Sequence, residues 1–162
     1  MASFKKLTFT TSQGSIYLID FTLLEINPLV DEIDVYDLLL KQESYNGQQN
    51  YEVLNFLGNE VPAFLEKNDG IIYFYCDNSE IKKNTRNAHL SNQEFRNRLF
   101  SAMFERRKVN ARINGNAFDF VLRNIQIKDP VNGDHFISLI SKMNQLESLQ
   151  KLADEMLSIG DK

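Results

Sequence analysis

Apolar and polar side chains alternate along much of the first forty residues, with the period of two that is typical of half-buried β-strands. Residues 7–11 and 16–24 show this alternation, and the segment 12–15 between them has the composition of a turn. The two runs therefore predict a β-hairpin. A third strand is predicted at 35–41, where Tyr36 begins another alternating set of apolar residues.

The spacing changes to that of a helix after residue 50. Apolar residues recur at intervals of three and four across 51–65, and Gly58 and Pro62 lie inside this run. Because proline removes a backbone hydrogen bond from a helix interior, we expect two short helices here. The next run, 71–76, is continuously apolar and predicts a central strand that is covered on both faces.

The second half of the chain opens with a helix signal. Ser91 and Glu94 have the spacing of a capping box and predict a helix that extends to about Lys108. Asn114-Gly115 is a hairpin signal, so we expect it to join two strands. The remaining predicted elements are strands at 109–113, 117–127 and 135–141, and a last helix at 144–160.

This order of elements, β-β-β-α-β-α-β-β-α, predicts an α+β fold. Three connections are hairpin-like, so we expect a mostly antiparallel sheet with helices packed chiefly on one face. At 162 residues the chain has the length of a single domain, 1–162. Residues 78–90 are polar and charged and connect a predicted strand to a helix, so we expect a mobile segment there.

Composition argues against several kinds of site. The chain has one cysteine, Cys76, and two histidines, so it cannot form an internal disulfide and we expect no metal site. It contains no glycine-rich phosphate loop and no hydrolase motif, so we expect no cofactor. No run approaches the ~20 apolar residues that cross a bilayer, and the first residues lack an apolar secretion signal. We therefore expect a cytoplasmic protein that does not bind membranes.

The distribution of charge carries most of the functional signal. Half of the 18 Lys and Arg residues lie between Lys82 and Arg112, although the whole chain has a net charge of −4. Such asymmetry indicates a surface for a partner rather than a particular fold. The cations that we expect to form this basic face are Lys82, Lys83, Arg86, Arg106 and Arg107.

A second polar cluster is predicted around Arg96. On a helical wheel Arg96 lies within the apolar arc of its helix, where an unpaired guanidinium is costly. Asp77, which follows the central strand, is its expected partner, and Cys76 lies beside it. Two interpretations stay open. We favour an ion pair that fixes the helix to the sheet. The alternative is a pocket in which Arg96 or Arg107 binds an anion and Asp77 or Cys76 does chemistry.

The strand end Tyr75-Cys76-Asp77 and the helix segment Arg96-Asn97-Arg98-Leu99-Phe100 resemble an uncharacterised bacterial family of small cytoplasmic proteins. The hairpin from Phe4 to Phe21 is also similar to the start of that family. The family brings the strand and the helix closer together and often has a Trp in the helix, whereas this chain has the longer segment 78–90 and no Trp. The resemblance implies no activity.

These observations favour a non-catalytic protein-interaction or regulatory accessory module of the antitoxin or immunity kind. We expect a protein partner, and an acidic one suits the basic segment. A nucleic-acid or anionic-ligand binder that uses 82–112 is the alternative, and a small enzyme around Cys76, Asp77 and Arg96 is the third. The last helix has an apolar face that we expect to pack on the sheet, with a homodimer through this helix as the alternative.

Overall fold

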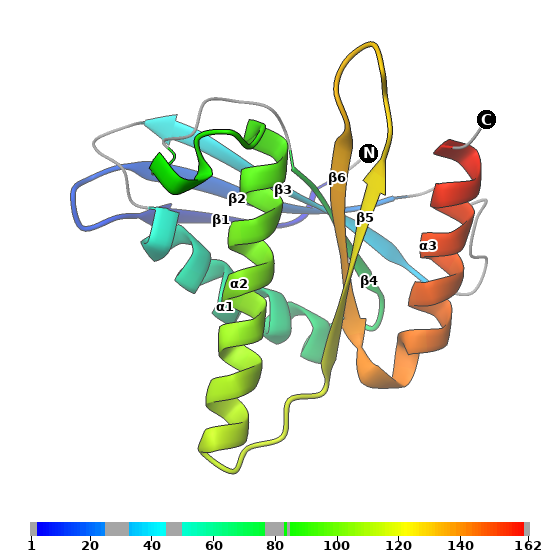
Figure 1. The fold of residues 1–162 in the computed structure, drawn as a ribbon. Helices are drawn as coiled ribbons and strands as arrows, with labels where there is room; N and C mark the ends of the chain where they lie inside the picture. The colour runs from blue at the N-terminus through cyan, green and yellow to red at the C-terminus, as the bar shows by residue number, and fades with distance from the viewer. Residues whose placement is uncertain (1–2, 25–32, 45–49, 77–82, 84, 161–162) are drawn as a thin grey trace.

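A computed structural model describes residues 3–24, 33–44, 50–76, 83 and 85–160 of the chain. Within these residues, six strands form one sheet and three α-helices pack against it (Figure 1). The strands are β1 (Ser3–Thr10), β2 (Ile16–Leu23), β3 (Val35–Ser44), β4 (Ile71–Cys76), β5 (Phe120–Ile127) and β6 (His135–Lys142). The helices are α1 (Asn50–Lys67), α2 (Asn92–Ile113) and α3 (Leu146–Gly160).

The strand order in the sheet is β1-β2-β3-β4-β6-β5. Neighbouring strands are antiparallel except for β3 and β4, which are parallel. A parallel pair needs a long crossover connection, and α1 supplies it. The predicted α+β class with a mostly antiparallel sheet is confirmed.

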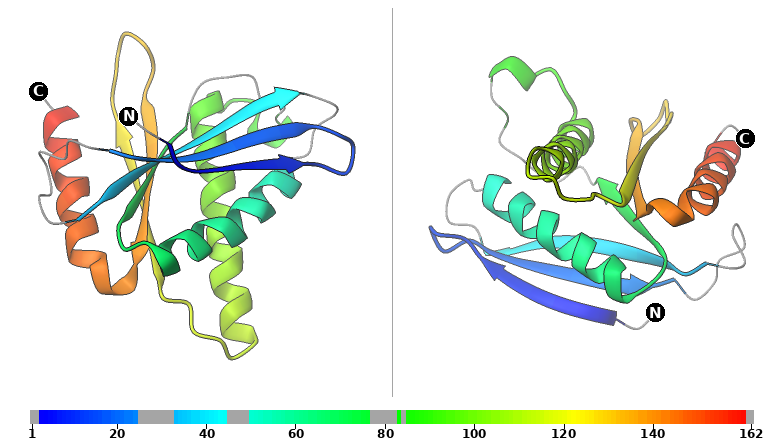
Figure 2. Two further views of the ribbon diagram at one scale, coloured as in Figure 1. Left: turned by 180° about the vertical axis from the view of Figure 1, so that it is seen from behind. Right: turned by 90° about the horizontal axis from the view of Figure 1, so that it is seen from below.

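The three helices cover the two faces of the sheet unequally. α1 and α2 lie on one face, whereas α3 packs on the other face against β5 and β6 (Figure 2). Two of the three helices therefore share a face, as the sequence predicts. Among the described helices, none combines the length and the apolar character that a membrane span requires.

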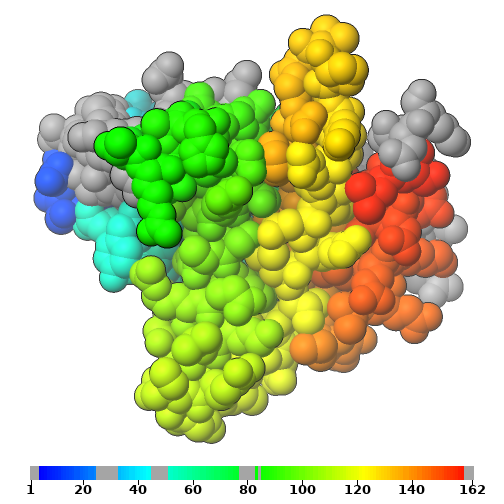
Figure 3. Space-filling model, viewed as in Figure 1, coloured from blue at the N-terminus to red at the C-terminus, as the bar shows by residue number. Residues whose placement is uncertain are grey.

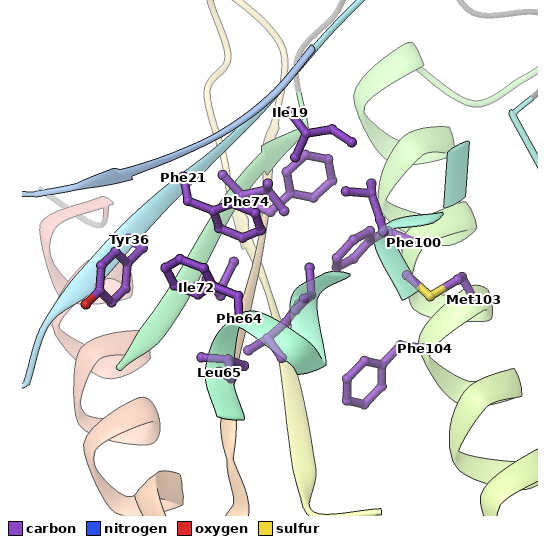
Figure 4. Packing of buried hydrophobic residues seen from close by; sticks show 14 of the residues in the cluster. Ile19, Phe21, Tyr36, Phe64, Leu65, Ile72, Phe74, Phe100, Met103 and Phe104 are labelled. Atoms are coloured by element: carbon purple, nitrogen blue, oxygen red, sulfur yellow. The ribbon is translucent and has the colours of Figure 1, made fainter. Parts of the chain in front are cut away.

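The larger of the two hydrophobic cores lies between α1, α2 and the sheet (Figure 4). Phe64 of α1 stacks on Phe21 of β2, with ring centroids 4.2 Å apart and ring planes 6° apart, and both side chains are fully buried. Burial of a side chain of this size stabilises the fold by roughly 1.5–3 kcal/mol. In the smaller core, Leu149 and Leu152 of α3 are buried against the sheet, so the apolar face of the last helix packs on its own chain.

The prediction of two short helices across 51–65 is wrong, because α1 runs unbroken through Gly58 and Pro62. Proline at this position removes the one hydrogen bond that its N–H would donate to the carbonyl of residue 58. Val61, before the proline, and Phe64, after it, are buried in the core. Burial of apolar side chains on both sides of the proline outweighs the loss of one backbone hydrogen bond.

The predicted strand at 109–113 and the hairpin turn at Asn114-Gly115 are also wrong, because α2 continues to Ile113. Gly115 has a φ of 71°, and the N–H of Asn116 donates to the carbonyl of Ala111 at 2.8 Å. This is the hydrogen-bond pattern that closes a helix with a glycine in the left-handed region. Asn-Gly favours hairpins for the same conformational reason, so the dipeptide alone does not distinguish the two structures.

Candidate functional site

The five cations predicted to form one basic face do not form one solvent-facing patch. Lys82 lies outside the described residues. Lys83 is half-buried, and its Nζ donates to the carbonyl of Leu90 at 2.9 Å and to Oδ1 of Asn92 at 2.8 Å. Lys83 therefore holds the chain against the start of α2.

Arg86 and Arg106 are exposed, but they lie at different ends of α2. Arg86 belongs to a short 3-10 turn, Thr85–Asn87, that precedes the helix. Fourteen residues separate the first residue of α2, Asn92, from Arg106, which is about 21 Å of helix. Residues 78–82 and 84 of the segment predicted to be mobile lie outside the described residues, so its mobility stays a prediction.

Arg107 packs between the two helices of the larger core instead of facing the solvent. Its Nη2 donates to the backbone carbonyl of Asn55 at 3.0 Å, and its guanidinium lies over Gly58. A half-buried guanidinium needs a carboxylate or carbonyl partner, and α1 provides a carbonyl. Arg107 therefore joins α2 to α1.

The predicted Arg96–Asp77 pair involves a residue outside the described part of the chain, because Asp77 is not described. Arg96 is half-buried, as its place on the helical wheel predicts. Cys76 is fully buried, and its Sγ lies 3.9 Å from Nδ2 of Asn97. The same amide nitrogen donates to Oγ of buried Ser138 at 3.1 Å, so Cys76 lies beside a buried polar network.

Arg96 lines a cleft of about 250 Å³ between β3 and β4. The two strands pair only from Val35–Ile71 to Asp37–Tyr73, and the cleft lies beyond this short ladder. Its other lining residues are Asp37, Leu38, Leu39, Leu40, Tyr73, Phe74 and Tyr75.

Two of the residues that line this cleft have raised pKa values. Burial raises the pKa of Asp37, and the nearby Asp20 raises it further. Burial also raises the pKa of Tyr73 to about 12, with a contribution from Asp37.

The most exposed apolar side chains of α2 lie at its C-terminal end. Ile113 is 75% exposed and Val109 is 45% exposed, and the cations Arg106 and Arg112 beside them are exposed too. Arg106, Val109 and Ile113 recur at intervals of three and four and so share one face of the helix. Figure 3 shows this end of α2 extending beyond the body of the molecule. We call residues 106–113 the α2 end.

A groove of about 240 Å³ between α1 and α2 leads to the α2 end. Tyr51, Leu54 and Asn55 line it from α1, and Leu99, Ala102, Met103 and Arg106 line it from α2. The guanidinium carbon of Arg106 lies 6.0 Å from the ring centroid of Tyr51, a distance at which a cation–π contact is favourable. Because Arg106 belongs to both features, the groove and the α2 end form one continuous surface.

Sequence reasoning identified Arg106 but missed the two apolar residues next to it. Apolar residues at 109, 111 and 113 alternate with polar ones, and this pattern predicts a strand that includes Val109 and Ile113. The spacing from Arg106 also fits a helix face. Asn-Gly also ends helices, and this property of Asn114-Gly115 is the signal that extends the predicted helix to include Val109 and Ile113.

No protein-family model matches this chain, and neither a curated protein nor a solved structure matches it.

Proposed function

We propose that this protein is a non-catalytic interaction module that binds an acidic partner protein through the α1–α2 groove and the α2 end. The observation that carries the proposal is the exposure of Ile113 and Val109 between the exposed cations Arg106 and Arg112. Protein interfaces combine apolar anchors with a polar rim, and arginine is enriched in them. Such a surface favours a partner that carries both apolar and acidic side chains.

The groove suggests how the partner binds. An apolar side chain of the partner fits between Leu54, Leu99 and Met103, while its carboxylates meet Arg106 and Arg112. The contact with the Tyr51 ring keeps the Arg106 guanidinium in place at the rim of the groove. Less side-chain entropy is then lost when the partner binds.

The structure offers less support for nucleic acid as the ligand. Proteins that bind single-stranded nucleic acid stack bases on exposed aromatic rings. Phe95, Phe100 and Phe104, which alternate with the cations of α2, are all buried in the core.

Burial also weighs against an enzyme that uses Cys76 as its nucleophile, since this side chain has 0% of its surface exposed. That this module has an antitoxin-like or immunity-like role stays a proposal, and the partner protein that such a role requires is still to be identified.

A pull-down from lysate of the source organism tests the proposal, with nuclease present throughout. The bait proteins are the wild type, the double variant Arg106→Glu/Arg112→Glu, and the control Arg123→Glu. Arg123 is exposed on β5, and its side chain alternates with Leu122, which packs on the α2 face, so it points to the opposite face of the sheet. The control therefore reverses a charge away from the groove.

We expect an acidic protein to be captured in stoichiometric amount by the wild type and the control but not by the double variant. A second double variant, Val109→Ser/Ile113→Ser, keeps the charge and removes the apolar anchors, and we expect it to lose at least tenfold in affinity for that protein. Capture that is equal in all four proteins would show that the proposed surface is not the binding site.

A further inference from the structure

β3 continues well beyond the point where β4 stops pairing with it. The ladder between the two strands ends at Asp37–Tyr73, whereas β3 extends to Ser44. Figure 2 shows the two strands diverging from this point. Among the residues that the structure describes, no strand pairs with the β4 side of 38–44, although β2 pairs with its other side. We call the β4 side of 38–44 the free edge of β3.

A hydrogen bond at the start of the two strands shows which backbone groups point to this edge. The carbonyl of Asp34 accepts the N–H of Ile71 at 2.9 Å, so the backbone of residue 34 points toward β4. Backbone groups of alternate residues point to the same side of a strand. Leu40 and Gln42 therefore direct their N–H and C=O groups to the free edge. An exposed row of such groups is a template for a further strand.

The cleft between β3 and β4 opens onto the free edge. Consecutive residues line it from both strands, Asp37–Leu40 from β3 and Tyr73–Tyr75 from β4. Side chains of consecutive residues point to opposite faces of a sheet, so a cleft with such a lining runs between the two strands and not over one face. An extended chain that enters the cleft therefore lies with its backbone beside that of β3.

The side of the cleft that faces α2 is mostly apolar. Leu38 and Phe74 belong to the larger core, and Leu40 packs against it. Arg96 reaches the cleft from α2 on this side. Every second side chain of a strand in the cleft would point to this side, and an apolar side chain there would be removed from water.

The opposite side of the cleft carries negative charge. Asp37 alternates with the core residue Leu38 and so lies on this side, where burial and then the charge of Asp20 raise its pKa. Among the described residues, no lysine or arginine forms an ion pair with Asp37. Tyr75 also lies on this side, but its hydroxyl reaches across β4 to within 2.6 Å of Nδ1 of His135. A basic side chain is therefore favoured beside Asp37.

We propose that this cleft binds an extended segment of a partner protein, in which apolar and basic side chains alternate, as an additional strand on the free edge of β3. The backbone of the segment pairs with that of Leu40 and Gln42. Its apolar side chains pack beside Leu38 and Phe74, and its basic side chains meet Asp37. In this kind of recognition, main-chain hydrogen bonds give affinity and alternate side chains give specificity.

This site is separate from the proposed interaction surface. Seventeen residues separate Arg96, at the cleft, from Ile113, at the α2 end, which is about 25 Å of helix. The double variant Arg106→Glu/Arg112→Glu should therefore bind a strand-forming peptide as tightly as the wild type does. Failure of one proposal leaves the other unaffected.

Isothermal titration calorimetry with the peptide acetyl-Lys-Val-Lys-Val-Lys-Val-Lys-amide tests the proposal, and we expect one peptide to bind per protein. N-methylation of the central valine and of the next lysine removes a backbone donor from each edge of the peptide strand. This change should weaken binding at least about tenfold, whichever edge pairs with β3. The methylated peptide keeps its charge, so equal binding of both peptides would reveal only a general attraction to an acidic protein and would overturn the proposal.

A pair of variants tests the charge recognition. Asp37→Asn should weaken binding of the unmethylated peptide about fivefold, the effect of losing one partly exposed ion pair. Asp154→Asn removes the same charge from an exposed position on α3 and should leave the affinity unchanged. Equal affinities of the two variants would contradict the assignment of Asp37 as the group that selects a basic side chain.

Amide hydrogen exchange measured by NMR locates the peptide. The N–H groups of Leu39 and Lys41 point to β2 and should exchange slowly with and without peptide. Those of Leu40 and Gln42 should exchange fast in the free protein and at least tenfold more slowly in the complex. Unchanged exchange of Leu40 and Gln42 on addition of peptide overturns the proposal. So does slow exchange in the free protein that becomes fast on dilution, because a second copy of the chain then occupies the edge.

Discussion

The guanidinium of Arg107 occupies the space over Gly58 that a side chain on α1 would otherwise fill. A Cβ atom at position 58 would lie 2.8 Å from Nε of Arg107 and 2.8 Å from Sδ of Met103. The glycine therefore allows α2 to pack closely against α1 and allows Arg107 to reach the carbonyl of Asn55. The close packing of the two helices thus accounts for a residue of low helix propensity inside α1.

Gly58→Ala should destabilise the protein by about 1 kcal/mol. Overpacking of a tight contact costs about 1–3 kcal/mol, and the higher helix propensity of alanine returns about 1 kcal/mol. Urea denaturation of both proteins measures the difference in the free energy of unfolding. The same substitution should cost less in an Arg107→Ala background, because one of the two obstructing side chains is then absent. A more stable Gly58→Ala protein in the wild-type background would contradict this account of the packing.

Ser91→Ala should reduce the free energy of unfolding by about 1 kcal/mol, the usual effect of losing a helix N-cap. Oγ of Ser91 accepts the backbone N–H of Glu94 at 3.1 Å, and alanine cannot replace this hydrogen bond. Ser158→Ala is the matched control, because Ser158 is exposed within α3. We expect the control to change stability by less than about 0.5 kcal/mol. Equal effects of the two substitutions would argue against a role for the cap.

Asp37 should make the protein less stable as the pH rises. Burial, and then the charge of Asp20, raises the pKa of Asp37 in the folded state above its value in the unfolded chain. The folded state therefore binds more protons between these two pKa values, and stability falls as the pH rises through that window. Asp37→Asn should remove this dependence and be more stable than the wild type at pH 7. Thermal melts of both proteins from pH 3 to pH 8 provide the measurement, and parallel curves would contradict the prediction.

Asp129 should show the opposite dependence on pH. Hydrogen bonds from the backbone N–H of Asn132 and from the His135 imidazole lower the pKa of Asp129 to about 2. The unfolded chain therefore binds more protons than the folded protein between about pH 4 and pH 2. The stabilising contribution of Asp129 is fully present above this window and is lost as the pH falls through it. NMR titration of the carboxyl carbon should give a midpoint near 2 in the wild type and a higher midpoint in His135→Gln, which lacks the imidazole. A midpoint near 4 in the wild type would show that these hydrogen bonds do not form in solution.

The local elements of this fold could be predicted from the sequence because each depends on neighbouring residues. The alternation in 16–24 and the continuous apolar run in 71–76 gave β2 and β4, and Ser91 marked the start of α2. The insertion of β6 between β4 and β5 is a long-range pairing, and no local pattern indicates it. Asn114-Gly115 is typical of both hairpin turns and helix ends, so the dipeptide alone predicts the wrong structure here.

The candidate sites were less predictable than the fold. The sequence identified Arg96 as partly buried because helical periodicity places it in the apolar arc. It gave no indication that Tyr75 and His135, sixty positions apart, are within hydrogen-bonding distance. Lys83 and Arg107 are predicted to lie on the surface, because the carbonyls of Leu90 and Asn55 that bind them belong to the backbone and have no signature in the sequence.

The short parallel ladder between β3 and β4 has a consequence for the order of folding. β1, β2 and β3 pair through consecutive antiparallel strands, and β5 and β6 form a hairpin, so both groups can assemble from local contacts. β4 lies between these two groups and pairs with each over a long sequence separation, with β3 across α1 and with β6 across α2 and β5. Both pairings carry a cost in loop-closure entropy, and the ladder to β3 has three positions against five in the ladder to β6. We therefore expect β4 to be the last strand to join the sheet, and its short ladder to β3 to be the first of its contacts to open.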